Sequence, residues 1–173
     1  MNGSGRNYFL AAVIAYGLSA IYSVFLWRKG FRQADRVNYG LLLLAAIFHT
    51  NAMFKRGFSF DRCPVNNLYE ATTFLLWTIA ATYLVVGLWP RFRFLGAFAA
   101  PLLFSVGVVA LMPGLDNPYG ARPEFKHDWV SLHAALILLS YGAFGLSSVA
   151  GLDRKSTRLN SSHVQPSRMP SSA

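Results

Sequence analysis

Long apolar runs separated by short polar segments dominate the pattern of this chain. Five runs approach or exceed membrane length, at residues 8–27, 37–54, 71–89, 94–112 and 129–152. A helix needs about 20 mainly apolar residues to cross the hydrocarbon layer. Because lipid offers the backbone no hydrogen-bond partners, each run is predicted to be an α-helix. The pattern therefore predicts an all-α fold, a polytopic membrane bundle of about five transmembrane helices.

The composition agrees with a membrane environment. Of the 173 residues, 54% are hydrophobic and 13% are charged, whereas a soluble domain carries roughly 25% charged residues. The formal net charge of +9 requires no nucleic acid, because basic loops also face anionic lipid. We therefore expect membrane lipid, and no nucleic acid, as a partner.

The charged loops predict an orientation. The loop after the first run is basic, with Arg28, Lys29, Arg32 and Arg36 against a single Asp35. The loop after the third run carries Arg91 and Arg93 and no acid. Because basic loops stay on the cytoplasmic side, the N-terminus and loops two and four are predicted to lie on the outer face. The expected location is the bacterial inner (plasma) membrane.

The composition changes sharply after Leu152. Residues 153–173 contain no aromatic residue and are rich in serine, which is typical of a disordered tail. The string from Arg154 to His163 also looks like translated sequencing adapter, and a non-native segment has no place in fold reasoning. The predicted organisation is a membrane domain over 1–152 and a disordered or non-native tail over 153–173.

Two histidines stand out because they lie inside, or at the start of, apolar runs. His49 lies about five residues from the predicted outer end of the second run. His133 follows Trp129 by four residues, so both side chains project from one helix face. An intramembrane histidine is costly and often functional, and neutral imidazole is a good axial ligand for haem iron. Two histidines near one membrane face suggest a shared ligand, while simple helix packing stays open for His49. His127 precedes this run in a charged segment and is expected to be solvated.

A polar segment joins the second and third runs. Asn67 is predicted to cap the third helix, with Glu70 reaching back to the cap from three residues further on. Cys63 precedes Pro64 in this segment, and as the single cysteine of the chain it excludes an internal disulfide. Cys63 is expected to be a small residue before a turn, with a reactive thiol as the alternative.

The order of these motifs resembles the cytochrome c assembly family, more narrowly its CcsA-type membrane subunit. The resemblance covers residues from about 41 to 151 and rests on His49, on Asn67-Leu68-Tyr69-Glu70, and on Trp129, His133, Ser140, Tyr141 and Phe144. It implies that His49 is an intramembrane axial ligand of haem iron. It also implies that His133 is an axial ligand at the outer face, that Trp129 takes part in binding the haem, and that Asn67, Tyr69 and Glu70 form a family motif.

The resemblance implies haem binding, delivery of haem b across the membrane and its presentation for covalent attachment to apocytochrome c. A second cytochrome c biogenesis membrane subunit is the expected partner. The tryptophan-rich Trp-Gly-x-x-Trp-x-Trp-Asp motif of the family does not occur in this sequence. Two explanations are open: a fragment cut off after five of about eight helices, which the adapter-like string favours, or a related branch that naturally lacks the motif. As a component of a cytochrome c haem lyase, the fragment is expected to be inactive alone. The alternatives are a non-enzymatic transporter-type subunit with structural or proton-relaying histidines, or a modulator of haem biosynthesis or assembly.

Overall fold

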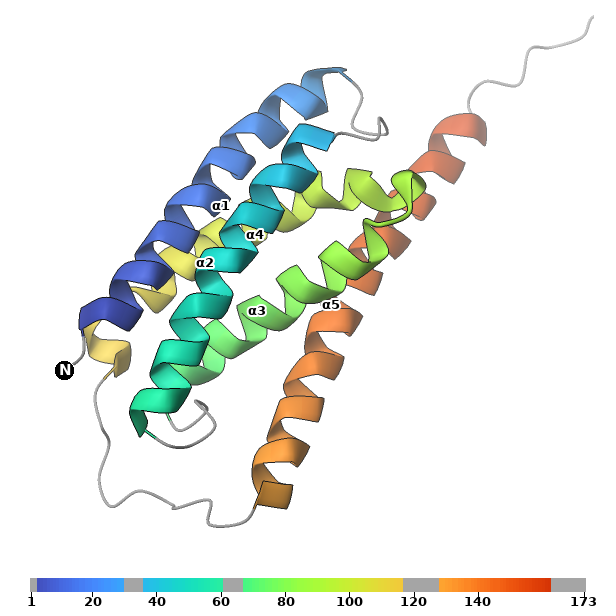
Figure 1. Cartoon of the computed structure of the whole chain (residues 1–173). Coiled ribbons are helices and arrows are strands. Elements are labelled where there is room, and N and C mark those ends of the chain that lie inside the picture. Colours follow the sequence, from blue (N-terminus) through green and yellow to red (C-terminus); the bar gives the residue numbers. More distant parts are fainter. Residues whose placement is uncertain (1–2, 30–35, 61–66, 117–127, 163–173) are drawn as a thin grey trace, which may run out of the picture.

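The chain folds as a bundle of helices (Figure 1). The computed structural model describes residues 3–29, 36–60, 67–116 and 128–162. The five helices are α1 (Gly3–Lys29), α2 (Arg36–Phe60), α3 (Leu68–Val86), α4 (Gly96–Ala110) and α5 (Asp128–Ser162). Two short 3₁₀ segments, η1 (Pro90–Leu95) and η2 (Pro113–Asp116), flank α4. No strand occurs in the described ranges, so the predicted all-α class is confirmed.

Four of the described helical segments are long and apolar enough to cross a membrane. They are Gly5–Arg28, Arg36–Gly57, Leu68–Val86 and Pro90–Ala110. Within the fifth predicted run, the described part of α5 includes the apolar stretch Leu132–Ser148. Many large apolar side chains on these helices are exposed, as expected where lipid rather than water is the neighbour. The chain is an integral membrane protein.

Helix α3 packs against three of the other four described helices. Helix α1 lies against α2 and α4, and α3 lies against α2, α4 and α5. The largest fully buried apolar side chains come from all of the first four helices: Phe9, Tyr16, Leu42, Leu76, Tyr83 and Leu103. The core therefore runs between α1, α2, α3 and α4, and α5 is attached to one side of it.

Helix α5 approaches α3 closely at Gly142. A Cβ atom at this position would lie 3.0 Å from the main-chain nitrogen of Ile79 and would collide with the Thr78 hydroxyl. The same hydroxyl hydrogen-bonds the Leu138 carbonyl oxygen across the interface at 3.1 Å. Small residues let membrane helices pack at short range. Gly142 therefore fixes how closely α5 sits on α3.

Helix α5 continues past Leu152, where the fifth run was predicted to end. Residues 153–162 are helical, which differs from the disordered tail expected from composition. The physical reason is that neither glycine nor proline interrupts the chain between Leu152 and Pro166. Residues 163–173 lie outside the described residues, as do Cys63 and His127. The non-native origin of residues 153–173 stays a prediction.

Candidate functional site

His49 lies in the interior of the bundle, on the part of α2 that faces α1 and α3. Its side chain is fully buried. The Tyr16 hydroxyl of α1 lies 3.1 Å from its Nδ1 atom, and the Phe9 ring lies 5.0 Å from the imidazole between ring centroids. Phe9 and Tyr16 are seven residues apart, about two turns, so they project from one face of α1. Beside His49, the Trp77 indole N–H donates to the Thr50 hydroxyl at 2.9 Å and aligns α3 with α2.

The second ring nitrogen of His49 is in a different situation. Nε2 is buried and has no hydrogen-bond partner among the described residues. The main-chain carbonyl of Thr73 lies near the imidazole, but its geometry does not make a hydrogen bond to Nε2. A buried polar atom left unpaired costs about 1–3 kcal/mol, so such an atom calls for an explanation. An imidazole nitrogen of this kind fits the chemistry of an axial iron ligand.

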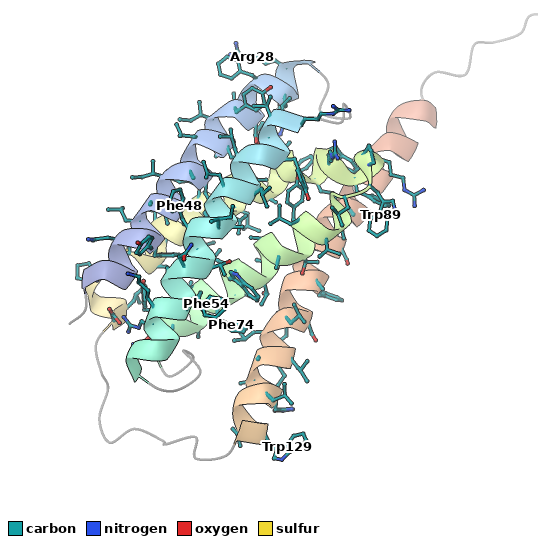
Figure 2. All side chains as sticks on the ribbon, viewed as in Figure 1. Arg28, Phe48, Phe54, Phe74, Trp89 and Trp129 are labelled. Atoms are coloured by element: carbon teal, nitrogen blue, oxygen red, sulfur yellow. The ribbon has the colours of Figure 1, made fainter. Side chains whose placement is uncertain are left out.

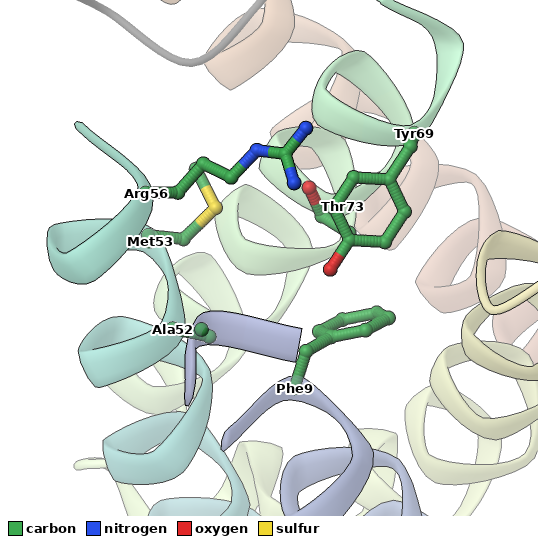
Figure 3. A pocket seen from close by; sticks show the side chains of 7 residues that line it. Phe9, Ala52, Met53, Arg56, Tyr69 and Thr73 are labelled. Atoms are coloured by element: carbon green, nitrogen blue, oxygen red, sulfur yellow. The ribbon is translucent and has the colours of Figure 1, made fainter. Parts of the chain in front are cut away.

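A small pocket shares Phe9 and Thr73 with the surroundings of His49, although His49 itself does not line it. A pocket of about 10 Å³ lies between α1, α2 and α3, with Phe9, Met53, Arg56, Tyr69 and Thr73 in its wall (Figure 3). This volume holds about one water molecule. The donor atom of His49 thus fits an iron ligand, while the packing around it must open before a porphyrin could enter.

A group of charged side chains closes the bundle above this pocket. The Arg56 guanidinium donates from Nε to the Glu70 carboxylate at 3.0 Å. It also donates through both terminal nitrogens to Asp116, at 3.2 Å and 2.5 Å. The Glu70 side chain is 1% exposed and the Asp116 side chain 11%. Arg56 therefore ties the end of α2 to the start of α3 and to η2.

The motif residues Asn67, Tyr69 and Glu70 all contact this charged group or form part of it. The Asn67 carboxamide oxygen accepts the Glu70 backbone N–H at 2.7 Å, which confirms Asn67 as the cap of α3. The bond of the Glu70 side chain back to the cap stays a prediction. The Asn67 side-chain nitrogen donates to Asp116 at 3.2 Å. Asn67 thus anchors both the start of α3 and the charged group.

Tyr69 connects the charged group to the histidine site. Its ring lies 5.0 Å from the Arg56 guanidinium and meets the Phe9 ring edge to face at 5.7 Å. Phe9 in turn contacts His49. The motif and the intramembrane histidine, which are about twenty residues apart in the sequence, are therefore joined through a single aromatic side chain.

Trp129 and His133 occupy a separate place. Both lie at the start of α5, and both are exposed, Trp129 to 80%. Helix α5 packs against α3, whereas His49 faces α1 and α3 from α2. The described residues do not bring the two histidines into one ligand pocket. Nor do these residues hold a group of three or more His, Cys, Asp or Glu side chains that could bind a metal ion.

Four residues of the site could not be singled out from the sequence. Phe9 and Tyr16 lie in the first apolar run with no distinguishing neighbour in the sequence, and Arg56 and Asp116 stand out there only as charges beside apolar runs. One signal was available, because Glu70 beside an apolar run requires a cationic partner when it is buried. The nearby cations on α2 were the candidates for that partner.

The fold and the site define a polytopic helical membrane protein with a buried histidine beneath a charged helix end. No protein-family model matches the chain. The chain is similar to curated proteins called cytochrome c biogenesis protein CcsA. It is 30% identical to that of Gloeobacter violaceus over 118 residues, which is 65% of this chain and 34% of the relative. It is 27% identical to that of Trieres chinensis over 143 residues, or 81% of this chain and 44% of the relative.

These similarities confirm the predicted relationship to the CcsA-type cytochrome c assembly proteins. A further relative, from Guillardia theta, is 23% identical over 146 residues, covering 83% of this chain and 46% of the relative. The chain therefore spans about a third to a half of the length of the curated relatives it matches.

Proposed function

We propose that the chain acts in cytochrome c biogenesis by binding haem as its cargo, with His49 as a ligand of the iron. The observation that carries the proposal is the buried Nε2 atom of His49, which has no partner among the described residues. The names of the relatives support the biological process. The cargo is haem b, which supplies the vinyl groups that react with apocytochrome thiols.

We propose that His133 acts at the outer end of the bundle. His133 is exposed at the start of α5, at the end of the bundle where Trp129 is labelled in Figure 2. There it would hold haem within reach of apocytochrome c. A second membrane subunit of the same biogenesis system is the proposed partner. In this arrangement the protein contributes ligands and positioning for the attachment reaction.

The proposed orientation places the N-terminus on the outer side of a bacterial inner membrane. Arg28 marks the opposite end of the bundle from Trp129 (Figure 2). Arg91 and Arg93 lie in η1, after the end of α3, so the alternation of helices assigns them to the Arg28 end. The positive-inside rule supports a cytoplasmic position for that end.

Haem content of a His49 variant tests the proposal. The protein is purified in detergent from haem-replete cells, and haem per polypeptide is measured as the pyridine haemochrome, whose spectrum also identifies the haem type. We expect b-type haem in the wild-type protein and a loss of most of it in His49→Gly. Asn51→Ala is the matched control, because Asn51 lies two residues away on α2 and is exposed.

An equal haem content in His49→Gly and in the control would overturn the proposal. The Tyr16 contact would then assign His49 to helix packing, as in the alternative of a membrane subunit with structural histidines.

A further inference from the structure

Tyr16 contacts Nδ1 of His49, the ring nitrogen opposite the unpartnered Nε2. The two side chains are both fully buried, and their rings meet edge to face with centroids 6.0 Å apart. The hydroxyl lies 3.1 Å from Nδ1. Tyr16 comes from α1 and His49 from α2, so the contact fixes the imidazole relative to a neighbouring helix.

The contact bears on which nitrogen carries the proton of the neutral imidazole. A neutral imidazole has one N–H donor and one lone pair. When Nδ1 carries the proton and donates it to the Tyr16 oxygen, Nε2 holds the lone pair that a metal requires. When the phenol donates to Nδ1 instead, Nε2 carries a buried N–H with no acceptor of good geometry among the described residues.

We propose that Tyr16 is a positioning residue that selects Nε2 of His49 as the nitrogen that coordinates iron. This inference rests on the proposed haem binding. Histidine ligands generally donate their other N–H to a fixed partner, which orients the ring and makes the ligand more basic. The Tyr16 oxygen fills that place here, and Phe9 holds the ring from a second direction.

The haem-free protein offers a direct readout. Histidine is labelled with ¹⁵N, and the His49 resonances are assigned by their loss in His49→Gln. We expect Tyr16→Phe to shift the Nδ1 resonance of His49 and to leave the other histidines unchanged. Tyr83→Phe is the matched control, because Tyr83 is equally buried but its hydroxyl bonds to the Arg93 carbonyl at the other end of α3. This control is expected to leave the His49 resonances in place.

The haem-loaded protein provides the second readout. Loss of such a partner lowers metal-site affinity by about 10- to 100-fold in comparable sites. We therefore expect Tyr16→Phe to weaken haem binding by about 10-fold or more and to raise the midpoint potential of the iron, because the ligand becomes less basic. Tyr83→Phe is expected to keep both values. Monodisperse elution of each variant shows that the bundle is intact.

The outcomes separate this inference from the proposed function. If His49→Gly removes haem while Tyr16→Phe keeps the resonance, the affinity and the potential of the wild type, the role of Tyr16 is wrong and haem binding at His49 stands. If His49→Gly keeps its haem, the proposed function fails and the selection of an iron ligand by Tyr16 fails with it, whatever the Nδ1 resonance shows.

Discussion

Arg56 binds the buried carboxylate of Glu70 at 3.0 Å. The two residues come from opposite sides of the polar segment that joins α2 and α3. The pair is largely buried, because the Glu70 side chain is 1% exposed and the Arg56 side chain 21%. A buried charge is tolerated when it is paired and hydrogen-bonded, so the pair holds the end of α2 beside the start of α3.

Replacement of Glu70 by Gln should destabilise the bundle by about 1.5–3 kcal/mol, the range for a hydrogen bond to a charged group. Arg56 keeps its contacts with Asp116, which holds the loss below that of an isolated buried pair. The free energy of unfolding is measured in detergent by denaturant titration with tryptophan fluorescence. Ser147→Ala on exposed α5 is the control and should change stability by much less. A Glu70→Gln protein as stable as this control would contradict the importance of the pair.

Replacement of Gly142 by Ala should loosen the contact between α5 and α3. The added Cβ would press on the Thr78 hydroxyl and on the Ile79 backbone, and overpacking of this kind costs about 1–3 kcal/mol. Gly145→Ala is a matched control three residues away, because nothing lies within 4 Å of a Cβ there. The rate of proteolysis between α4 and α5 reports the loosening. Equal rates in the two variants would show that α5 is not held at Gly142.

The proposed orientation predicts a defined pattern of reporter fusions. Alkaline phosphatase is active only outside the cytoplasm, so a fusion after Asn117 should be active and one after Arg93 inactive. Phosphatase activity per unit of fusion protein is the measurement, with a β-galactosidase series giving the complementary pattern. The reverse result would invert the bundle and place His49 nearer the cytoplasmic face.

His133→Gly should abolish cytochrome c maturation in cells that depend on a protein containing this chain. Because the His133 position is exposed, imidazole added to the medium should reach the place of the proposed ligand and restore part of the haem-stained cytochrome c. His127→Gly is the control and should mature cytochrome c normally. Normal cytochrome c maturation in His133→Gly would contradict the proposed ligand role of His133.

Much of the fold could be predicted from the sequence because each helix is a local property. The apolar runs predicted the five helices, and the cap at Asn67 follows from a side chain that bonds its own neighbour three residues on. Within the fifth run, the stretch Leu132–Ser148 is apolar and helical as predicted.

The site could be predicted only in part because its contacts depend on how the helices rotate against one another. His49 could be singled out as a histidine in hydrocarbon. Its contact with Tyr16 spans 33 positions, and that of Arg56 with Asp116 spans 60. No periodicity in the sequence specifies such pairs, which require the packing of α1, α2, α3 and η2 to be known.

The attachment of α5 through Gly142 has a mechanical consequence. Among the described helices, α5 shares its main interface with α3, and α3 supplies Thr73 to the surroundings of His49. A tilt of α5, such as docking of a protein at its exposed first turns would cause, reaches the imidazole chiefly by displacing α3. Helix α1, with Tyr16 and Phe9, packs mainly against α2 and α4. The two sides of the histidine are therefore built by helices with different neighbours, and the α3 side is the one that carries the main contact with α5.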